Sequence, residues 1–274
     1  MSRRYLAPTD DATGAHVHKK RFGQHFLHDP GIIRRIVQAV APKPGDRLIE
    51  IGPGEGAITL PLLREHGELT VIELDRDLIP RIEAAAAGIG KLGVIQADVL
   101  SVDFTRLAQG GTLRVVGNLP YNISSPILFH CLEHASAISD MHFMLQKEVV
   151  DRMACGPGSK VYGRLSVMLQ LSCRVEPLFN VPPGAFNPPP KVDSAVVRLT
   201  PLPPQARHDA DAGLVARIVR HAFGQRRKTL SNALQGVATA QQIEAAGIDP
   251  RTRAEQLAPS RFVDLAKVVA REAT

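Results

Sequence analysis

Several side chains that could bind a nucleoside follow short apolar runs in the first half of the chain. Gly52, Gly54 and Gly56 follow the first run and allow a tight turn whose backbone N–H groups can approach a ligand closely. Glu73 closes the second run, and its carboxylate can accept hydrogen bonds from both hydroxyls of a ribose. Asp98 closes the third run, and its carboxylate could accept a hydrogen bond from an adenine amino group. Each acid could instead be a turn residue or a helix cap. Together they favour a nucleoside-bearing cofactor, which leaves NAD and S-adenosylmethionine open.

A fourth apolar run ends in Asn118, Leu119, Pro120 and Tyr121. Asn and Pro are common turn residues, so alone the four would predict only a turn. Beside a nucleoside cofactor they suit methyl transfer to an exocyclic amine such as adenine N6. The Asn118 side-chain carbonyl and the Leu119 main-chain carbonyl can each accept an N6–H bond, which aims the nitrogen lone pair at a methyl group. Pro120 restricts the backbone of Leu119, and Tyr121 offers a flat face for the base. This favours S-adenosylmethionine over NAD.

A parallel sheet with crossover helices would bring these strand ends together. The pattern predicts helices over residues 32–40, 56–66, 76–88 and 162–172. Runs too short for buried helices predict strands between them. These runs are residues 47–52, 69–74, 92–97, 113–118 and 141–146.

The sequence after this region divides into shorter segments. Residues 179–193 are predicted to form a proline-dense loop, and residues 194–199 a strand. We predict a flexible N-terminal arm at 1–18, a catalytic α/β domain at 19–200 and a C-terminal all-helical domain at 201–274, which opens with a linker.

Charge and cysteine content narrow the class of protein. The chain has a net charge of +6, and residues 1–35 and 214–234 carry +4 and +5 respectively. Such segments are often only solvated faces, but two of them in one chain favour a polyanionic partner. The three cysteines are widely spaced, which argues against a zinc site and a disulfide framework. Neither a signal peptide nor a membrane span is expected, so we predict a cytoplasmic protein with no metal and no membrane partner.

The chain resembles the small-subunit (16S) rRNA adenine N6,N6-dimethyltransferases (the KsgA group) from about Lys20 to its end. Nine short motifs carry the resemblance in order: FGQHFLHD, EIGPGEGAIT, IELD, ADVL, GNLPYNISSPIL, MLQKEVVDRM, YGRLSVMLQ, FNPPPKVDSAVVRL and HAFGQRRKTLSNAL. The resemblance implies a Rossmann-like class I methyltransferase sheet with a small C-terminal all-helical domain. It implies that two methyl groups are placed on each of two adjacent adenosines in the 3′-terminal hairpin of 16S rRNA. The partner would be the immature small ribosomal subunit, and the enzyme a monomer.

The same resemblance assigns site residues. It implies cofactor contacts at His25, Leu27, Gly52, Glu73, Asp98 and Asn118, within a turn that includes Gly54 and Gly56. Tyr121 and Phe186 would sandwich the target adenine, although Phe186 could instead be a core anchor of its loop. The family usually has Asn where this chain has His25. The basic segments would bind rRNA phosphates through Lys19, Lys20, Arg21, Arg220, Arg226, Arg227 and Lys228.

Other functions fit parts of the sequence. A large-subunit rRNA adenine methyltransferase of the antibiotic-resistance type is the nearest alternative, and the motifs NLPY and YGRLSVMLQ favour the small-subunit type over it. A DNA adenine methyltransferase fits less well. An NAD oxidoreductase would explain the glycine turn and Glu73 but not residues 118–121. A ribosome assembly factor, for which binding matters more than methylation, is an alternative of a different class.

Overall fold

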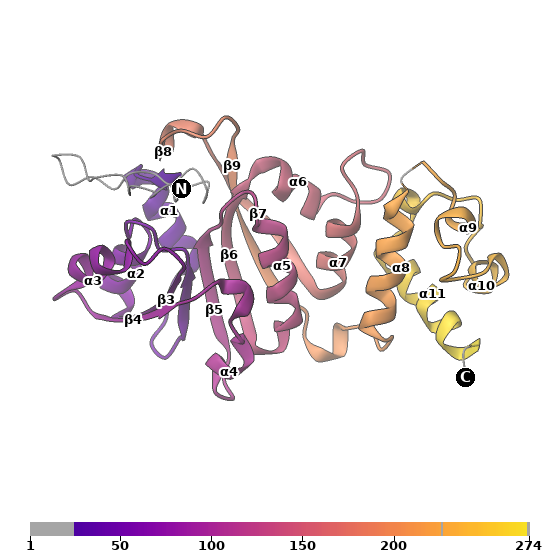
Figure 1. Cartoon of the computed structure of the whole chain (residues 1–274), viewed down its shortest axis with the longest axis horizontal. Helices are drawn as coiled ribbons and strands as arrows, with labels where there is room; N and C mark the ends of the chain where they lie inside the picture. The colour runs from indigo at the N-terminus through magenta and orange to yellow at the C-terminus, as the bar shows by residue number, and fades with distance from the viewer. Residues whose placement is uncertain (1–24, 226, 273–274) are drawn as a thin grey trace, which may run out of the picture.

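The computed structural model describes residues 25–225 and 227–272. These residues form a seven-stranded sheet with helices packed around it (Figure 1). The strand order is β4-β3-β2-β5-β6-β9-β7. The strands are β2 (Leu48–Ile51), β3 (Glu68–Glu73), β4 (Lys91–Gln96), β5 (Leu113–Asn118), β6 (Ile138–Gln146), β7 (Cys173–Val181) and β9 (Ser194–Pro201). The predicted arm, Lys19, Lys20, Arg21 and Arg226 lie outside the described residues.

Five neighbouring strands, from β4 to β6, are parallel, which confirms the predicted parallel sheet over this part. The other edge differs from the prediction: β9 runs antiparallel to both β6 and β7. The sheet is therefore mixed. A parallel strand needs a long crossover connection, whereas β7 and β9 are joined by a loop that reverses the chain direction.

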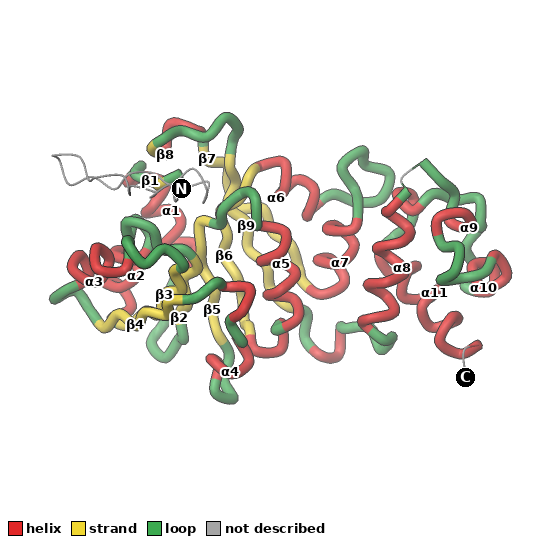
Figure 2. The backbone as a smooth tube through the Cα atoms, viewed as in Figure 1, coloured by secondary structure: helices red, strands yellow, loops and turns green. Residues whose placement is uncertain are grey.

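Helices cover both faces of the sheet (Figure 2). Strand residues alternate between the faces, so Val115 packs in one apolar cluster and Val116 in the other. One cluster includes residues of α1 (Pro30–Val40), α2 (Thr59–His66) and α3 (Ile79–Ala86). The other includes residues of α4 (Phe104–Ala108), α5 (Ser124–Glu133), α6 (Lys147–Ala154) and α7 (Arg164–Ser172). This arrangement holds the carboxyl ends of the parallel strands at one edge.

Three strands were not predicted. Residues 179–181, expected in a loop, are the end of β7, which has a register shift beside Pro177. The strands β1 (Phe26–Leu27) and β8 (Phe186–Asn187) are two residues long and pair antiparallel. This small pairing joins the start of the described chain to the loop that follows β7.

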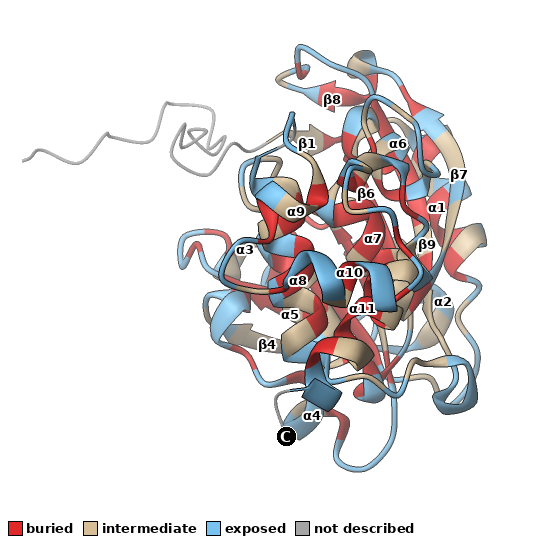
Figure 3. Cartoon of the chain, turned by 90° about the vertical axis from the view of Figure 1, so that its right-hand side faces the viewer, coloured by how far each residue is buried: buried red, intermediate tan, exposed pale blue. Residues whose placement is uncertain are grey.

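The C-terminal part is helical, as predicted, and lies beyond α7 in Figure 1. It contains α8 (Ala212–Gly224), α9 (Leu230–Ala233), α10 (Ala240–Ala245) and α11 (Pro259–Glu272). Its apolar cluster also takes in Tyr162 and Val167, and Figure 3 shows buried residues on the inner sides of these helices. The predicted apolar face of α8 is confirmed at Val215, Ile218, Val219 and Ala222, while Phe223 is partly buried. The boundary between residues 200 and 201 stays a prediction.

Candidate functional site

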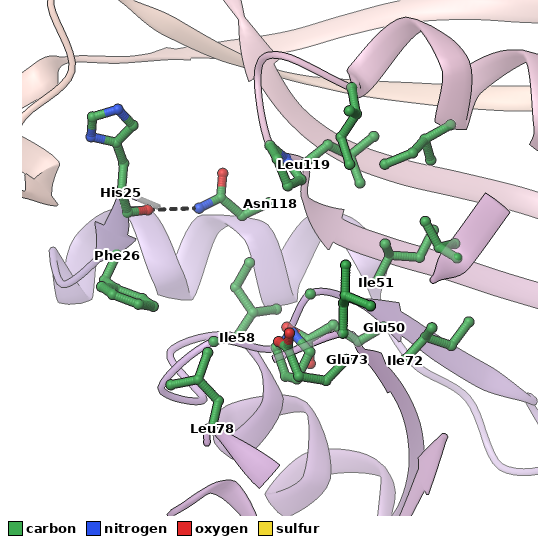
Figure 4. A pocket seen from close by; sticks show the side chains of 18 of the residues that line it. His25, Phe26, Glu50, Ile51, Ile58, Ile72, Glu73, Leu78, Asn118 and Leu119 are labelled. Carbon is green, nitrogen blue, oxygen red and sulfur yellow. Dashed lines mark hydrogen bonds between the residues drawn. The ribbon is translucent and has the colours of Figure 1, made fainter. Parts of the chain in front are cut away.

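A cavity of about 410 Å³ opens at the carboxyl edge of the parallel strands. It receives residues from β1, from the ends of β2, β3 and β5, and from the segments that follow β2, β3, β4 and β5 (Figure 4). Most of the predicted site residues line it: His25, Leu27, Gly52, Gly54, Glu73, Asp98, Asn118, Leu119, Pro120 and Tyr121. Gly56 and Phe186 do not line it.

The glycine turn after β2 has little room for side chains at two of its glycines, Gly54 and Gly56. Gly54 has a φ of 55°, and a Cβ there would lie 2.9 Å from Cε1 of Phe26. Phe26 therefore packs directly on the turn, and an alanine at 54 would displace the ring or strain the backbone. A Cβ at Gly56 would lie 2.5 Å from Cδ1 of Ile82. Gly56 thus lets the turn pack against α3. Since it does not line the cavity, its role in the predicted cofactor turn is one of packing.

Two buried carboxylates lie in the cavity, and sequence reasoning found only one of them. Glu73 is 8% exposed and accepts a hydrogen bond from the Asp75 N–H at 2.7 Å. Glu50 is 1% exposed, and Thr59 of α2 donates a 2.6 Å hydrogen bond to it. Burial and, to a smaller extent, the nearby Glu73 raise the pKa of Glu50 to about 7, against the lowering effect of the Thr59 hydrogen bond. Burial also raises the pKa of Glu73, despite backbone hydrogen bonds that lower it.

Glu50 had a sequence signal that went unused. It is the charged residue in Leu48–Ile51, a strand in which all four residues are buried. A carboxylate in such a strand is uncommon, and a perturbed pKa in a cleft marks a candidate functional group.

The segment that follows β4 brings an acid and an apolar side chain to the cavity. Asp98 is exposed and accepts a hydrogen bond from the Leu100 N–H at 3.0 Å, so it caps the short turn Val99–Ser101. The helix cap expected as an alternative is therefore present, and Asp98 lines the cavity as well. Leu74 and Leu100 also line the cavity and are 50% and 39% exposed. Two exposed leucines beside an acid can hold a flat heterocycle with an amino group.

The Asn118 side chain is held in one orientation. Its Nδ2 donates to the main-chain carbonyl of His25 at 3.1 Å, which leaves Oδ1 as the free end of the amide (Figure 4). The Leu119 N–H donates to the Met144 carbonyl at 3.1 Å, and Leu119 is 1% exposed. Within residues 25–225 and 227–272, neither Oδ1 of Asn118 nor the Leu119 carbonyl accepts a hydrogen bond. The two predicted acceptors are therefore unpaired among the described residues, and both residues line the cavity.

Gly117 makes this strand end possible. A Cβ at Gly117 would lie 2.8 Å from the carbonyl oxygen of Ile51, on the neighbouring β2. The close approach of the two backbones brings the end of β5 beside the glycine turn. An electrophile bound in the turn would therefore lie next to the acceptors at 118 and 119.

Tyr121 is held at its hydroxyl and contacts His25 through its ring. The hydroxyl hydrogen-bonds to Oγ of Ser194 at 2.5 Å, and Ser194 is fully buried. Burial raises the pKa of the Tyr121 phenol, against the effect of Ser194, so the ring stays neutral. The His25 ring stacks on Tyr121 with centroids 5.6 Å apart and planes at 28°. Sequence reasoning found both residues but not their contact.

Phe186 lies in a different environment from the one that the resemblance implies. It is 2% exposed and packs in the apolar cluster beneath α1 and α2, where β8 pairs it with Leu27. Because its ring is buried and outside the cavity lining, it is not an open stacking platform in this arrangement. The alternative of a loop anchor in the core fits the structure better.

The predicted RNA-binding residues that the structure describes lie outside the cavity. Arg220 on α8 is exposed, as are Arg227 and Lys228 in the turn before α9. Cys131, Cys155 and Cys173 are all free thiols. In the described part of the chain, no helix is both long and apolar enough to cross a membrane. The same residues contain no cluster of three His, Cys, Asp or Glu side chains that could hold a metal ion.

Comparison with known proteins places these features in a family. The model of the family described as ribosomal RNA adenine dimethylase matches residues 15–271. A curated "Ribosomal RNA small subunit methyltransferase A" from Xanthomonas campestris is 66% identical over 91% of this chain and 95% of its own length. A dimethyladenosine transferase structure from Plasmodium falciparum has a TM-score of 0.79 at 26% identity, over 91% of this chain and 98% of its own. The structure of 23S rRNA methyltransferase ErmE has a TM-score of 0.68 at 26% identity, over 89% and 99%.

Proposed function

This chain belongs to the ribosomal RNA adenine dimethylase family, and on that premise we propose the reaction that it catalyses and the residues that carry the reaction out. The protein is an rRNA adenine dimethyltransferase with a class I methyltransferase fold. The proposal is that it transfers methyl groups from S-adenosylmethionine to N6 of two adjacent adenosines in the 3′-terminal hairpin of 16S rRNA. Its substrate is the immature small ribosomal subunit, on which it acts as a monomer.

The charge of the cavity supports S-adenosylmethionine over NAD. Glu50 and Glu73 are buried there, and no Lys or Arg is among the described residues that line it. A cationic sulfonium and amino group suit this surface, whereas the diphosphate of NAD would meet two buried acidic side chains without a compensating cation. In this proposal Glu73 accepts hydrogen bonds from a ribose, and Asp98 accepts one from an adenine amine that lies between Leu74 and Leu100; all four residues line the cavity. The residues present therefore fit the cofactor.

Methyl transfer is assigned to the strand end at 118–121. S-adenosylmethionine supplies an electrophilic methyl group on its sulfonium. Oδ1 of Asn118 and the Leu119 carbonyl each accept one N6–H bond of the adenine, which directs the nitrogen lone pair away from the ring and toward the glycine turn. Tyr121 supports the base by stacking. The orientation of the Asn118 amide by the His25 carbonyl carries this assignment, because it turns an acceptor toward the substrate.

The degree of similarity favours the small-subunit substrate over the large-subunit alternative. The curated small-subunit methyltransferase from Xanthomonas campestris is 66% identical, whereas the 23S rRNA methyltransferase structure shares 26%. A role in small-subunit assembly is compatible with the same enzyme, because binding to the maturing subunit and methyl transfer use different surfaces.

The test is transfer of labelled methyl from S-adenosylmethionine to immature small subunits, with the product nucleoside identified. We expect N6,N6-dimethyladenosine in the 3′-terminal hairpin. Large subunits, tested in parallel, should remain unlabelled. Transfer to large-subunit rRNA alone would move the protein to the resistance type, and transfer to neither would favour the assembly-factor function.

A further inference from the structure

The contact between His25 and Tyr121 covers a surface that the proposed reaction needs. The two rings are near-parallel, with centroids 5.6 Å apart. A base inserted between two stacked rings needs a gap of about 7 Å, because each aromatic contact takes about 3.5 Å. The observed spacing is too small for an adenine. One face of Tyr121 is therefore already occupied by the imidazole.

We propose that the His25 imidazole holds the place of the target adenine on Tyr121 and that the incoming base displaces it. This inference rests on the proposed function, since it assumes that an adenine stacks on Tyr121. It assigns His25 to the base-binding end of the cavity, whereas the resemblance implied that His25 contacts the cofactor. In Figure 4 the His25 ring points to the same side as Oδ1 of Asn118, away from Glu50 and Glu73.

His25 is the more easily moved of the two rings. Among the residues that the structure describes, its side chain has one hydrogen bond, between Nδ1 and the Pro188 carbonyl at 2.8 Å, and it is only partly buried. It directly precedes β1, which is two residues long. Tyr121 is tied to the fully buried Ser194, the first residue of β9, which is paired with both β6 and β7. An entering base would therefore rotate the imidazole away and keep Tyr121 in place.

Displacing the ring need not disturb the catalytic amide. Asn118 is oriented by the main-chain carbonyl of His25, not by its imidazole. A substitution of the side chain leaves that acceptor in the chain. The alternative partner for a base sandwich, Phe186, is 2% exposed and outside the cavity. Removal of the imidazole should therefore open one face of Tyr121 without removing a necessary wall.

The test measures base entry directly. The probe is a synthetic RNA of the 3′-terminal hairpin of 16S rRNA with 2-aminopurine at one target position, whose fluorescence is quenched when it stacks on an aromatic ring. We compare the wild type with His25→Ala, His25→Phe and, as a matched control, His28→Ala, since His28 is exposed and outside the cavity lining. We expect His25→Ala to bind the probe about two- to tenfold more tightly, the size of one aromatic pair. His25→Phe, which restores a ring, should not tighten binding, and His28→Ala should match the wild type.

Three results would overturn the proposal. Probe binding that is unchanged or weaker in His25→Ala would mean that the imidazole does not compete with the base. Equal tightening by His25→Phe would assign the effect to removal of the Pro188 hydrogen bond. Weaker S-adenosylmethionine binding with unchanged probe binding would return His25 to the cofactor site. Methyl transfer by the wild type to immature small subunits is measured alongside, so that a failure of the proposed function is seen separately.

Discussion

At the carboxyl edge of the sheet, Glu50 and Glu73 are 1% and 8% exposed, whereas Arg220, Arg227 and Lys228 of the C-terminal region are all exposed. The two carboxyl groups are buried, and the partly buried Asn118 and Tyr121 are held by specific hydrogen bonds. The cations of the C-terminal region are solvated and can reach an extended polyanion. The difference separates two tasks: the sheet edge orients a few atoms for reaction, and the helical region supplies a charge that positions the RNA without reading its bases. The substitutions of Asn118 and of the C-terminal cations below should each affect one task and spare the other, and those of Glu50, Glu73 and Asp98 test the acids of the sheet edge.

Asn118→Ala should have the largest effect. It removes one of two acceptors for the adenine amine, and loss of one preorganised group of this kind costs about 10²–10³-fold in rate. Binding to immature small subunits should be unchanged, because Asn118 lies in the cavity and not among the exposed cations. Methyl transfer and equilibrium binding are measured on the same preparation, with the exposed Asn180→Ala as control. An equal loss of binding would make Asn118 a structural residue.

Glu50→Gln should change how stability depends on pH. The folded pKa of Glu50 is raised from 4.5 to about 7, so between these values the folded protein keeps a proton that the unfolded chain has lost. The free energy of unfolding of the wild type should therefore fall by about 3 kcal/mol as pH rises through this window. Gln can still accept the Thr59 hydrogen bond and carries no charge, so the fall should shrink in the variant.

Chemical denaturation at several pH values measures this effect. The control is Glu65→Gln, an exposed acid on the same helix as Thr59. A variant that keeps the wild-type pH dependence would show that Glu50 is not the titrating group.

Glu73→Gln should weaken S-adenosylmethionine binding more than Asp98→Asn. Glu73 is buried at the end of β3, and a hydrogen bond to a charged group contributes about 1.5–3 kcal/mol, or roughly 10- to 100-fold in affinity. Asp98 is exposed and already bonded to the Leu100 N–H, so its loss should cost less. Calorimetric titration of both variants gives the order. The reverse order would place the ribose away from Glu73.

Changing Arg226, Arg227 and Lys228 together to Ala should weaken binding to immature small subunits and flatten its salt dependence, and the loss of affinity should be the smallest effect of this series. Removing one cation that binds a phosphate lowers the slope of log affinity against log salt by roughly 1. Binding to immature small subunits is measured at several salt concentrations. Arg251→Ala serves as the control, since that exposed guanidinium is paired with Asp249. An unchanged slope in the triple variant would remove this segment from the RNA-binding surface.

The strand ends of the site could be predicted from the sequence, because short apolar runs followed by polar residues mark them directly. The ends of β3 and β5, at Glu73 and Asn118, agree with the prediction. The strand β7 escaped prediction because it is an edge strand with Pro177 and a register shift, features that weaken the pattern of a strand.

Interactions between residues far apart in the chain could not be predicted. The hydrogen bond from Asn118 to His25 spans 93 residues, and the one from Tyr121 to Ser194 spans 73. The burial of Phe186 depends on a pairing of two-residue strands that no local pattern reveals. Residue types thus indicated the chemistry, while the orientation of the groups required the fold.

Single-turnover methyl transfer from fully bound complexes tests the separation of the two tasks most directly. Immature small subunits are saturated with the wild type, with Asn118→Ala, or with the triple variant of Arg226, Arg227 and Lys228, and labelled S-adenosylmethionine starts the reaction. We expect the triple variant to transfer methyl at the wild-type rate once bound and Asn118→Ala to be slower by about 10²–10³-fold. A slow triple variant at saturation, or an Asn118→Ala that transfers normally, would contradict the account.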